Sequence, residues 1–305
     1  GFSAAPLKSY FIEKQGIIKN VRPVKDEGLK PIMTPNRTKY NKSVFYDVFP
    51  GEKEPSALSP RDPRLEVPLY DAIFSKYTGN VEAVIDPYIQ EAIQHYSSQL
   101  VTLDIDVNRL SLEEACYGTE GLDGIDLKTS AGYPYVTEGI KKRDLLNPET
   151  RDVTIIKSML DKYGLDHPLV TYMKDELRPL KKVRLGRTRV IEASSLNDTI
   201  EMRMVYGNLF RAFHQNPGVI TGSAVGCDPD VFWSKLRVSM QDCLLAFDYT
   251  AYDASLSPVW FDALKRVLQN IGYGGDDWKF IDQICNSRHI FGQVTYCNRG
   301  GMPSG

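Results

Sequence analysis

The sequence predicts a fold of mixed α and β structure, and two neighbouring segments carry that prediction. Residues 243–247 form a short apolar run that is typical of a fully buried strand. Residues 257–271 have the pattern of an amphipathic helix, with Ser257 as its cap and Pro258 at its first position. We therefore expect Asp248 at the end of a buried strand and Asp253 in the turn before the helix. The apolar side of this helix comprises Trp260, Ala263, Leu264, Val267, Leu268 and Ile271, and Gly272 can end it.

Caps and spacing predict four further helices. Asp86 and Pro87 are suited to the start of a helix over 86–100, and Ser111 with Glu114 forms a capping box at 111–117. Residues 152–163 and 197–213 complete the helical set. Residues 16–70 contain eight prolines, so we expect extended or turning chain there.

The composition excludes several classes of protein. The 305 residues are 42% hydrophobic and 25% charged, as in ordinary soluble globular proteins, and no apolar run is long enough to cross a membrane. Five cysteines without a C-x-x-C pair indicate reduced thiols, and four scattered histidines make a zinc site unexpected. The chain begins without methionine and stops in a loop-like segment at 300–305, so we expect a fragment of a longer polypeptide.

The two aspartates, five positions apart, indicate metal-dependent chemistry on phosphates. A carboxylate at the end of a buried strand is costly unless it is paired or binds a metal ion. Magnesium prefers a few carboxylates together with water and substrate phosphates, so Asp248 can supply one ligand. Phosphoryl transfer needs mainly positioning and charge neutralisation, which bound metal ions provide. The D-x-x-x-x-D spacing is weak by itself, and its position between strand and helix gives it weight.

A basic cluster supplies complementary charge. Residues 174–189 hold seven basic side chains against two acidic ones, a local net charge of +5 in a chain of net charge −2. A solvated hairpin tip is the simpler interpretation for any single lysine. The alternation of arginines with apolar residues instead favours a channel that attracts the phosphates of RNA or of a nucleotide. The cluster comprises Lys174, Arg178, Lys181, Lys182, Arg184, Arg187 and Arg189, with Asp175 and Glu176 as the acidic members.

The chain resembles the RNA-dependent RNA polymerases of enteroviruses, rhinoviruses included, in the picornavirus group. The resemblance extends from Gly16 to Gly305 and is carried by six motifs. They are TSAGYPY at 129–135, KDELR at 174–178, IEASSLND at 191–198, TGSAVGC at 221–227, FDYTAYD at 247–253 and GMPSG at 301–305.

The resemblance implies a right-hand polymerase fold, with the thumb absent from this chain. Residues 16–240 would form the fingers with some palm elements, and residues 241–305 the first part of the palm. Residues 1–15 resemble the C-terminal tail of the viral cysteine protease, and Gln15-Gly16 resembles that protease's cleavage site. A freed Gly16 amine would support the active site, so the uncleaved precursor is expected to be inactive.

Roles for individual residues also follow from the resemblance. Asp248 would be the catalytic residue that binds magnesium, helped by the carbonyl of Tyr249, and Asp253 would read the ribose 2′-hydroxyl. Thr129 and Ser130 would guide the template. The residues expected to bind the nucleotide, besides Asp253, are Lys174, Arg178, Lys182, Arg187 and Arg189 over the triphosphate, and Ser304 and Gly305 in a loop that adjusts to the new base pair.

A second pair of aspartates, at 276 and 277, has the same letters as the catalytic Gly-Asp-Asp signature of these polymerases but a different sequence context. Gly275-Asp276-Asp277 follows the helix-ending Gly272 and precedes apolar residues at helical spacing. In the signature, by contrast, the aspartates lie in a tight hairpin between apolar strands. We therefore expect Asp276 or Asp277 to be the N-cap of the next helix. The true hairpin, the asparagine partner of Asp253 and the thumb are expected after Gly305, so this chain alone should not polymerise.

The implied activity is template-directed attack of a primer 3′ end on the α-phosphate of a nucleotide, with loss of pyrophosphate. Two Mg²⁺ ions would serve the complete enzyme, with Mn²⁺ able to substitute. Expected partners are the RNA template and primer, nucleoside triphosphates, the viral protein primer and protease precursors, with self-association left open. The expected place is the host cytoplasm, at virus-induced membrane replication complexes reached through other replication proteins. The alternative is a non-catalytic RNA-binding precursor segment in which Asp248 is structural.

Overall fold

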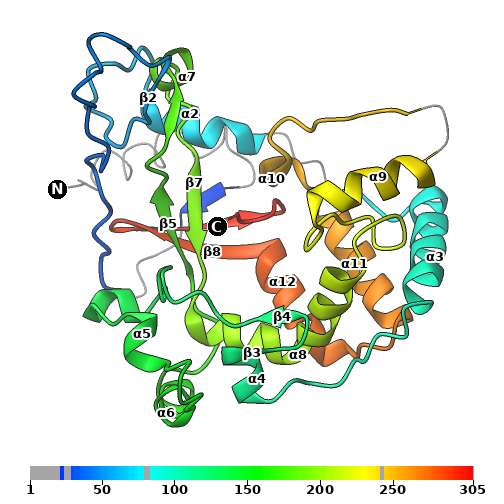
Figure 1. The fold of residues 1–305 in the computed structure, drawn as a ribbon. Coiled ribbons are helices and arrows are strands. Elements are labelled where there is room, and N and C mark those ends of the chain that lie inside the picture. Colours follow the sequence, from blue (N-terminus) through cyan, green and yellow to red (C-terminus); the bar gives the residue numbers. More distant parts are fainter. Residues whose placement is uncertain (1–20, 24–28, 79–82, 241–243, 305) are drawn as a thin grey trace.

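The computed structural model describes every residue except 1–20, 24–28, 79–82, 241–243 and 305, and centres on a five-stranded mixed sheet (Figure 1). The strand order is β1-β9-β8-β5-β7, with β5 and β8 parallel and the other neighbours antiparallel. Two-stranded sheets pair β2 with β6 and β3 with β4. The strands are β1 Val21–Pro23, β2 Lys53–Pro55, β3 Gly118–Thr119, β4 Leu122–Asp123, β5 Leu169–Met173, β6 Leu177–Pro179, β7 Val190–Ala193, β8 Asn286–Phe291 and β9 Val294–Arg299.

Most helices of the described residues lie below the central sheet and to its right in Figure 1, and α2 lies above it. The α-helices are α2 Leu69–Phe74, α3 Pro87–Val101, α4 Leu112–Tyr117, α5 Lys142–Leu145, α6 Thr154–Tyr163, α7 Leu180–Arg184, α8 Leu196–Gln215, α9 Pro229–Ser239, α10 Tyr252–Ser255, α11 Pro258–Asn270 and α12 Lys279–Cys285. Three short 3₁₀ helices are η1 Ser75–Thr78, η2 Tyr135–Glu138 and η3 Gly275–Trp278. Helix α11 packs on α3, and α4 packs on α8.

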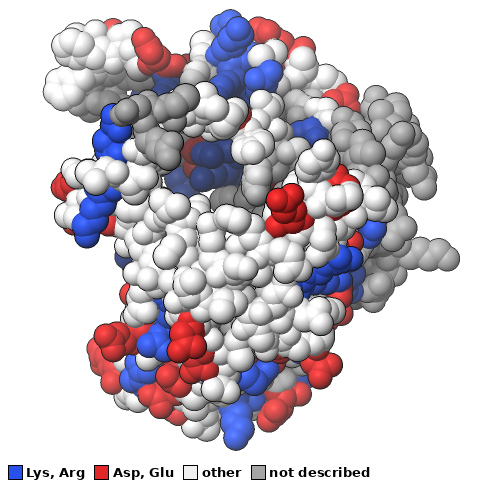
Figure 2. Space-filling model, turned by 90° about the vertical axis from the view of Figure 1, so that its right-hand side faces the viewer, with Lys and Arg blue, Asp and Glu red and all other residues white. Residues whose placement is uncertain are grey.

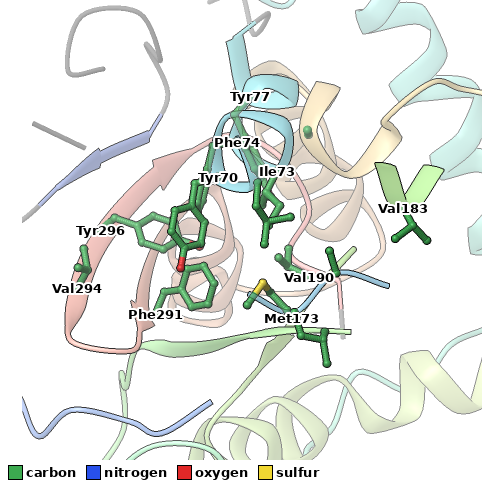
Figure 3. Close-up of a cluster of buried hydrophobic side chains, with 14 residues drawn as sticks. Tyr70, Ile73, Phe74, Tyr77, Met173, Val183, Val190, Phe291, Val294 and Tyr296 are labelled. Carbon is green, nitrogen blue, oxygen red and sulfur yellow. The ribbon is translucent and has the colours of Figure 1, made fainter. Parts of the chain in front are cut away.

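An aromatic core joins α2 and η1 to the sheet (Figure 3). Phe74 is fully buried, and its ring meets Tyr296 of β9 edge-on with centroids 5.6 Å apart. It also lies 6.3 Å from the ring of Phe291 on β8. Burial of such rings contributes more per residue than most apolar contacts, so this core holds η1 firmly against the sheet. Lys76 and Tyr77 of η1 are important in the site described below.

The predicted helices are confirmed where the local signals were strongest. Helix α3 starts after Asp86, whose carboxylate accepts from the backbone N–H of Ile89 at 2.8 Å. The Ser111–Glu114 capping box is present at α4. Helix α11 begins at Pro258 after Ser257, although the Ser257 side chain makes no cap hydrogen bond. The proline-rich region is extended or turning chain in its described residues up to α2, apart from the short strands β1 and β2.

The buried strand predicted at 243–247 is wrong for its described part. Residues 244–247 form no strand, and the side chains of Leu245 and Phe247 are 77% and 81% exposed. The central sheet ends on β1 and β7, and no strand in the described residues pairs with this segment. An apolar run indicates that burial is favourable, but burial of a strand also requires a neighbour for its backbone hydrogen bonds.

None of the helices in the described residues combines the length and the apolar character needed to span a bilayer.

Candidate functional site

Asp248 lies in an exposed coil segment with Tyr249 beside it. Its side chain has no hydrogen-bond or ion-pair partner among the described residues. The described part of the chain contains no group of three or more His, Cys, Asp or Glu side chains placed to hold a metal ion. One free carboxylate and a neighbouring backbone carbonyl nevertheless suit magnesium, which keeps water and substrate phosphates as its other ligands. Asp248 thus fits as a single protein ligand and not as a complete metal site.

Asp253 lies in α10, immediately after a backbone turn at Ala251. Ala251 adopts the left-handed conformation with φ 48°, which directs the chain from the Asp248 segment into the short helix. Oδ2 of Asp253 is 2.7 Å from Nζ of Lys76, and this ion pair is partly buried. The backbone carbonyl of Asp253 accepts from the N–H of Met302 at 2.6 Å. Asp253 is therefore held through both its side chain and its backbone.

The segment 300–304 connects Asp253 to the central sheet. Gly301 has φ 75°, and a Cβ at this position would lie 2.8 Å from the carbonyl oxygen of Asp253, so only glycine fits. The carbonyl of Ser304 accepts from the N–H of Glu192 on β7 at 2.8 Å. Gly305 lies outside the described residues. The structure thus brings two of the predicted nucleotide-binding positions, Asp253 and Ser304, to one short stretch of chain.

Glu176 organises the basic cluster, a role that the sequence did not indicate. Its Oε1 accepts from Nε of Arg189 at 2.7 Å and from a terminal nitrogen of Arg178 at 3.0 Å. Nζ of Lys174 lies 3.9 Å from Oε2. The Arg189 guanidinium, followed by that of Arg178, lowers the pKa of the Glu176 carboxyl to about 2. Three of the predicted phosphate-binding cations are therefore arranged around one carboxylate.

The other predicted cations of the cluster differ from these three. Lys182 belongs to α7 and Arg187 to the turn that follows it, and both side chains are exposed. Neither has an ion-pair partner in the part of the chain that the structure describes. On the face shown in Figure 2, lysine and arginine side chains lie inside a hollow. Such a hollow is suited to attract phosphate, because basic charge in a recess focuses the potential.

Thr129 and Ser130 line a pocket of about 780 Å³. Lys142, largely buried, donates from Nζ to Oγ1 of Thr129 at 2.6 Å, and burial lowers the pKa of its ammonium group. The pocket is lined by further basic side chains and by the aromatic ring of Tyr172, so it has groups for both phosphates and bases. Its basic lining residues are Lys128, Lys141 and Arg143.

Comparison with known proteins decides the family. The sequence model of the family described as "Viral RNA-dependent RNA polymerase" matches residues 42–305. This chain belongs to the viral RNA-dependent RNA polymerase family. It is 59% identical over 305 residues to the genome polyprotein of Porcine enterovirus 9 (strain UKG/410/73), covering all of this chain and 14% of that polyprotein. A solved structure, a Sicinivirus 3Dpol RNA-dependent RNA polymerase, matches with a TM-score of 0.82 and 32% identity.

This match covers 94% of the chain and 63% of the Sicinivirus polymerase, so the chain spans less than two thirds of the length of these relatives. The resemblance inferred from the motifs and the partial right-hand polymerase fold are thereby confirmed. Gln15, Gly16 and the protease-like tail lie outside the described residues, so the predicted cleavage site stays a prediction.

The Gly-Asp-Asp triplet at 275–277 lies in a short 3₁₀ helix directly before α12. It forms η3, and the N-cap is Gly274, not an aspartate as predicted. The Asp277 carboxylate instead accepts from the backbone N–H of Gly274 at 3.2 Å, from the third helical position. The N-cap of α12 is Trp278, so the prediction that Asp276 or Asp277 caps that helix is wrong. Asp277 instead belongs to a capping box at the start of η3.

One buried polar group escaped prediction entirely. Glu192, which contacts Ser304 through its backbone, buries its carboxylate under the central sheet beside His289. Thr171 and Tyr296 also hydrogen-bond to this carboxylate. Each residue lies on a different strand, so no local pattern could have joined them.

Proposed function

We propose that this chain supplies the phosphate-binding, ribose-reading and template-guiding part of an RNA-directed RNA polymerase. One observation carries the proposal: a run of backbone hydrogen bonds joins the predicted site residues. The N–H of Met302 donates to the carbonyl of Asp253, and the N–H of Glu192 on β7 donates to the carbonyl of Ser304. The N–H of Lys174 donates to the carbonyl of Arg189. Residues far apart in the sequence are thus fixed in one structural unit that contains an acceptor for a sugar and cations for phosphates.

In the proposed reaction a primer 3′-hydroxyl attacks the α-phosphate of a nucleoside triphosphate, and pyrophosphate leaves. Arg189, Arg178 and Lys174 bind the triphosphate, and Glu176 keeps their charged groups oriented toward it. Lys182 and Arg187 add exposed positive charge that attracts the incoming nucleotide. These residues act by positioning and by charge neutralisation, which are the main requirements of phosphoryl transfer.

Asp248 and the Tyr249 carbonyl are the proposed ligands for a divalent cation, Mg²⁺ with Mn²⁺ as a substitute. Such an ion, when bound, neutralises phosphate charge and lowers the pKa of the attacking hydroxyl. Asp253 accepts a hydrogen bond from the ribose 2′-hydroxyl, and Ser304 with Gly305 adjusts to the new base pair. The remaining carboxylates of a two-metal site are expected in the part of the relatives that this chain does not span.

The pocket beside Thr129 and Ser130 is the proposed path of the template. Its basic and aromatic lining suits single-stranded RNA, whose bases stack while its phosphates meet lysine and arginine. In this proposal residues 16–240 are the fingers, residues 241–305 are the first part of the palm, and residues 1–15 are a protease tail cut at Gln15-Gly16. The viral protein primer, the protease precursors and the cytoplasmic membrane complexes belong to the same proposal.

Substitution of Asp248 tests the proposal in the full-length polymerase. We expect Asp248→Ala to reduce RNA synthesis on the order of 10²–10³-fold or more, because a charge-stabilising group is lost at the reacting centre. RNA binding should be retained. Asp161→Ala, an exposed aspartate on α6, is the matched control and should leave both unchanged. Unchanged synthesis in Asp248→Ala would refute the assignment and favour a non-catalytic RNA-binding role.

A further inference from the structure

The backbone of Lys76 is anchored by the aromatic core that contains its neighbours Phe74 and Tyr77. Lys76 belongs to η1, between Phe74 and Tyr77, whose side chains are buried on β8 and β9 (Figure 3). The Phe74 and Tyr77 rings lie 6.3 Å apart, and Nζ of Lys76 lies 5.2 Å from the centre of the Tyr77 ring. Because both neighbours are anchored, the backbone of Lys76 has little freedom to move. Its side chain leaves this core toward α10.

Lys76 forms an ion pair with Asp253, the residue that binds the ribose 2′-hydroxyl in the proposed function. Nζ of Lys76 is 2.7 Å from Oδ2 of Asp253, although the residues are 177 positions apart. The Lys76 side chain is 26% exposed and that of Asp253 is 32% exposed. Partial burial makes the attraction stronger than that of a typical surface pair, because less water screens it.

Among the described residues, the contacts of Asp253 leave one of its two carboxylate oxygens without a partner. Its backbone is tied to Met302, and its Oδ2 to Lys76. Oδ1 has no hydrogen-bond partner among the described residues. An ionised carboxylate accepts through either oxygen, so an Asp253 held at Oδ2 presents Oδ1 in a defined direction.

We propose that Lys76 is a positioning residue for ribose selection: it holds the Asp253 side chain in one orientation, so that Oδ1 accepts the 2′-hydroxyl of the nucleotide. This inference rests on the proposed function. Lys76 does not belong to the 174–189 cluster, and its ammonium group is engaged by a carboxylate instead of facing open space. A lysine that contacted phosphate would help ribonucleotides and deoxyribonucleotides equally. A lysine that acts through Asp253 favours ribonucleotides, because only they carry the 2′-hydroxyl.

The test compares incorporation of ATP and dATP by the full-length polymerase. Lys76→Met removes the charge and keeps most of the volume. We expect the ratio of kcat/KM for ATP over dATP to fall about tenfold, the effect of losing one oriented, charge-assisted hydrogen bond. Incorporation of dATP should change little. Lys76→Arg keeps a cation and should restore part of the ratio. The matched control is Lys162→Met, since Nζ of Lys162 lies in a similar position, 4.9 Å from the Tyr163 ring on α6.

A double substitution separates this inference from the proposed function. In an Asp253→Ala background, Lys76→Met should cause no further loss of the ATP preference. If Asp253→Ala alone leaves the preference intact, the ribose-reading assignment itself is wrong. If Asp253→Ala abolishes the preference while Lys76→Met does not alter it, only the role of Lys76 is refuted. Equal losses for ATP and dATP in Lys76→Met would also refute it, and would instead identify a phosphate contact.

Thermal unfolding keeps the outcome interpretable. If Lys76→Met fails to fold, the ATP preference of Lys76→Arg still tests the proposal, because arginine retains the positive charge in a side chain of different shape. An ATP preference in Lys76→Arg equal to that of the native polymerase, together with no loss in Lys76→Gln, would overturn the proposal.

Discussion

Nδ1 of His289 lies 2.8 Å from Oε2 of Glu192, and the two side chains are 3% and 4% exposed. Thr171 donates to the same carboxylate oxygen at 2.8 Å. The His289 ring stacks on that of Tyr296 at 4.6 Å, with the planes almost parallel. Nε2 of His289 lies 2.6 Å from Oγ of Ser287. The network therefore joins β5, β7, β8 and β9 beneath the segment that ends at Ser304.

Loss of the Glu192 carboxylate should destabilise the fold. We expect Glu192→Ala to lower the free energy of unfolding by about 3–5 kcal/mol, because several buried polar groups would lose their partner. Glu192→Gln should cost less, since an amide oxygen can still accept from Thr171. Urea unfolding measures both. Glu149→Ala, at an exposed position, should stay within about 0.5 kcal/mol of the native chain. A similarly small effect in Glu192→Ala would contradict the role of the network.

The Glu176 cluster should make stability depend on pH in the acid range. The pKa of Glu176 lies at about 2 in the fold, below its ordinary value of 4.5, because Arg189 and Arg178 bind the ionised form. A depressed carboxyl pKa contributes stability above the unfolded value, and this contribution disappears as the pH falls from 4.5 toward 2.

Thermal unfolding of Glu176→Gln checks this dependence. The native chain should unfold at a higher temperature than Glu176→Gln at pH 6, and the difference should shrink toward pH 3. Glu52→Gln, an exposed residue outside the cluster, should show no such trend. A difference that stays constant between pH 6 and pH 3 would mean that Glu176 is not held by the arginines in its ionised form.

The capping box at α4 should contribute measurably to the free energy of unfolding. Oγ of Ser111 accepts from the N–H of Glu114 at 3.1 Å, and the Glu114 carboxylate accepts from the N–H of Ser111 at 3.2 Å. Ser111→Ala should cost about 1 kcal/mol in urea unfolding, because one helical N–H loses its acceptor. Ser98→Ala on α3 removes only a bond to a helical carbonyl and should have a smaller effect. Equal effects would argue against the capping box as the cause.

Substitution of Asp277 tests whether the Gly-Asp-Asp triplet has a capping role or a catalytic role. Asp277→Ala removes the acceptor for the Gly274 N–H and should destabilise the full-length polymerase by about 1 kcal/mol. Nucleotide incorporation per folded molecule should be unchanged, unlike in Asp248→Ala. Asp276→Ala, at an exposed neighbour, should alter neither property. Loss of incorporation in Asp277→Ala comparable with that of Asp248→Ala would show that this triplet has a catalytic role.

The sequence by itself determined the elements whose signals are local. The start of α3 after Asp86 and the capping box of α4 were predictable, because each depends on contacts within about four residues. The start of α11 at Pro258 was predictable because proline favours the first position of a helix. The motifs also located Asp248 and Asp253 as the residues of interest. Propensity and capping act over one helical turn, so they need no knowledge of the rest of the chain.

Only the tertiary structure decided which of these residues meet. The apolar run before Asp248 indicated a buried strand, but strand burial depends on a neighbour, and the described residues provide none. In the sequence Glu176 was only one of two acidic residues in the basic cluster, and only the structure shows that Arg178 and Arg189 bind its carboxylate. Lys76 and Asp253 are 177 positions apart, and Glu192 and His289 are 97 apart. Such pairs form because sheet order and core packing bring distant segments together. Neither sheet order nor core packing produces a periodic sequence pattern from which the pairs could be predicted.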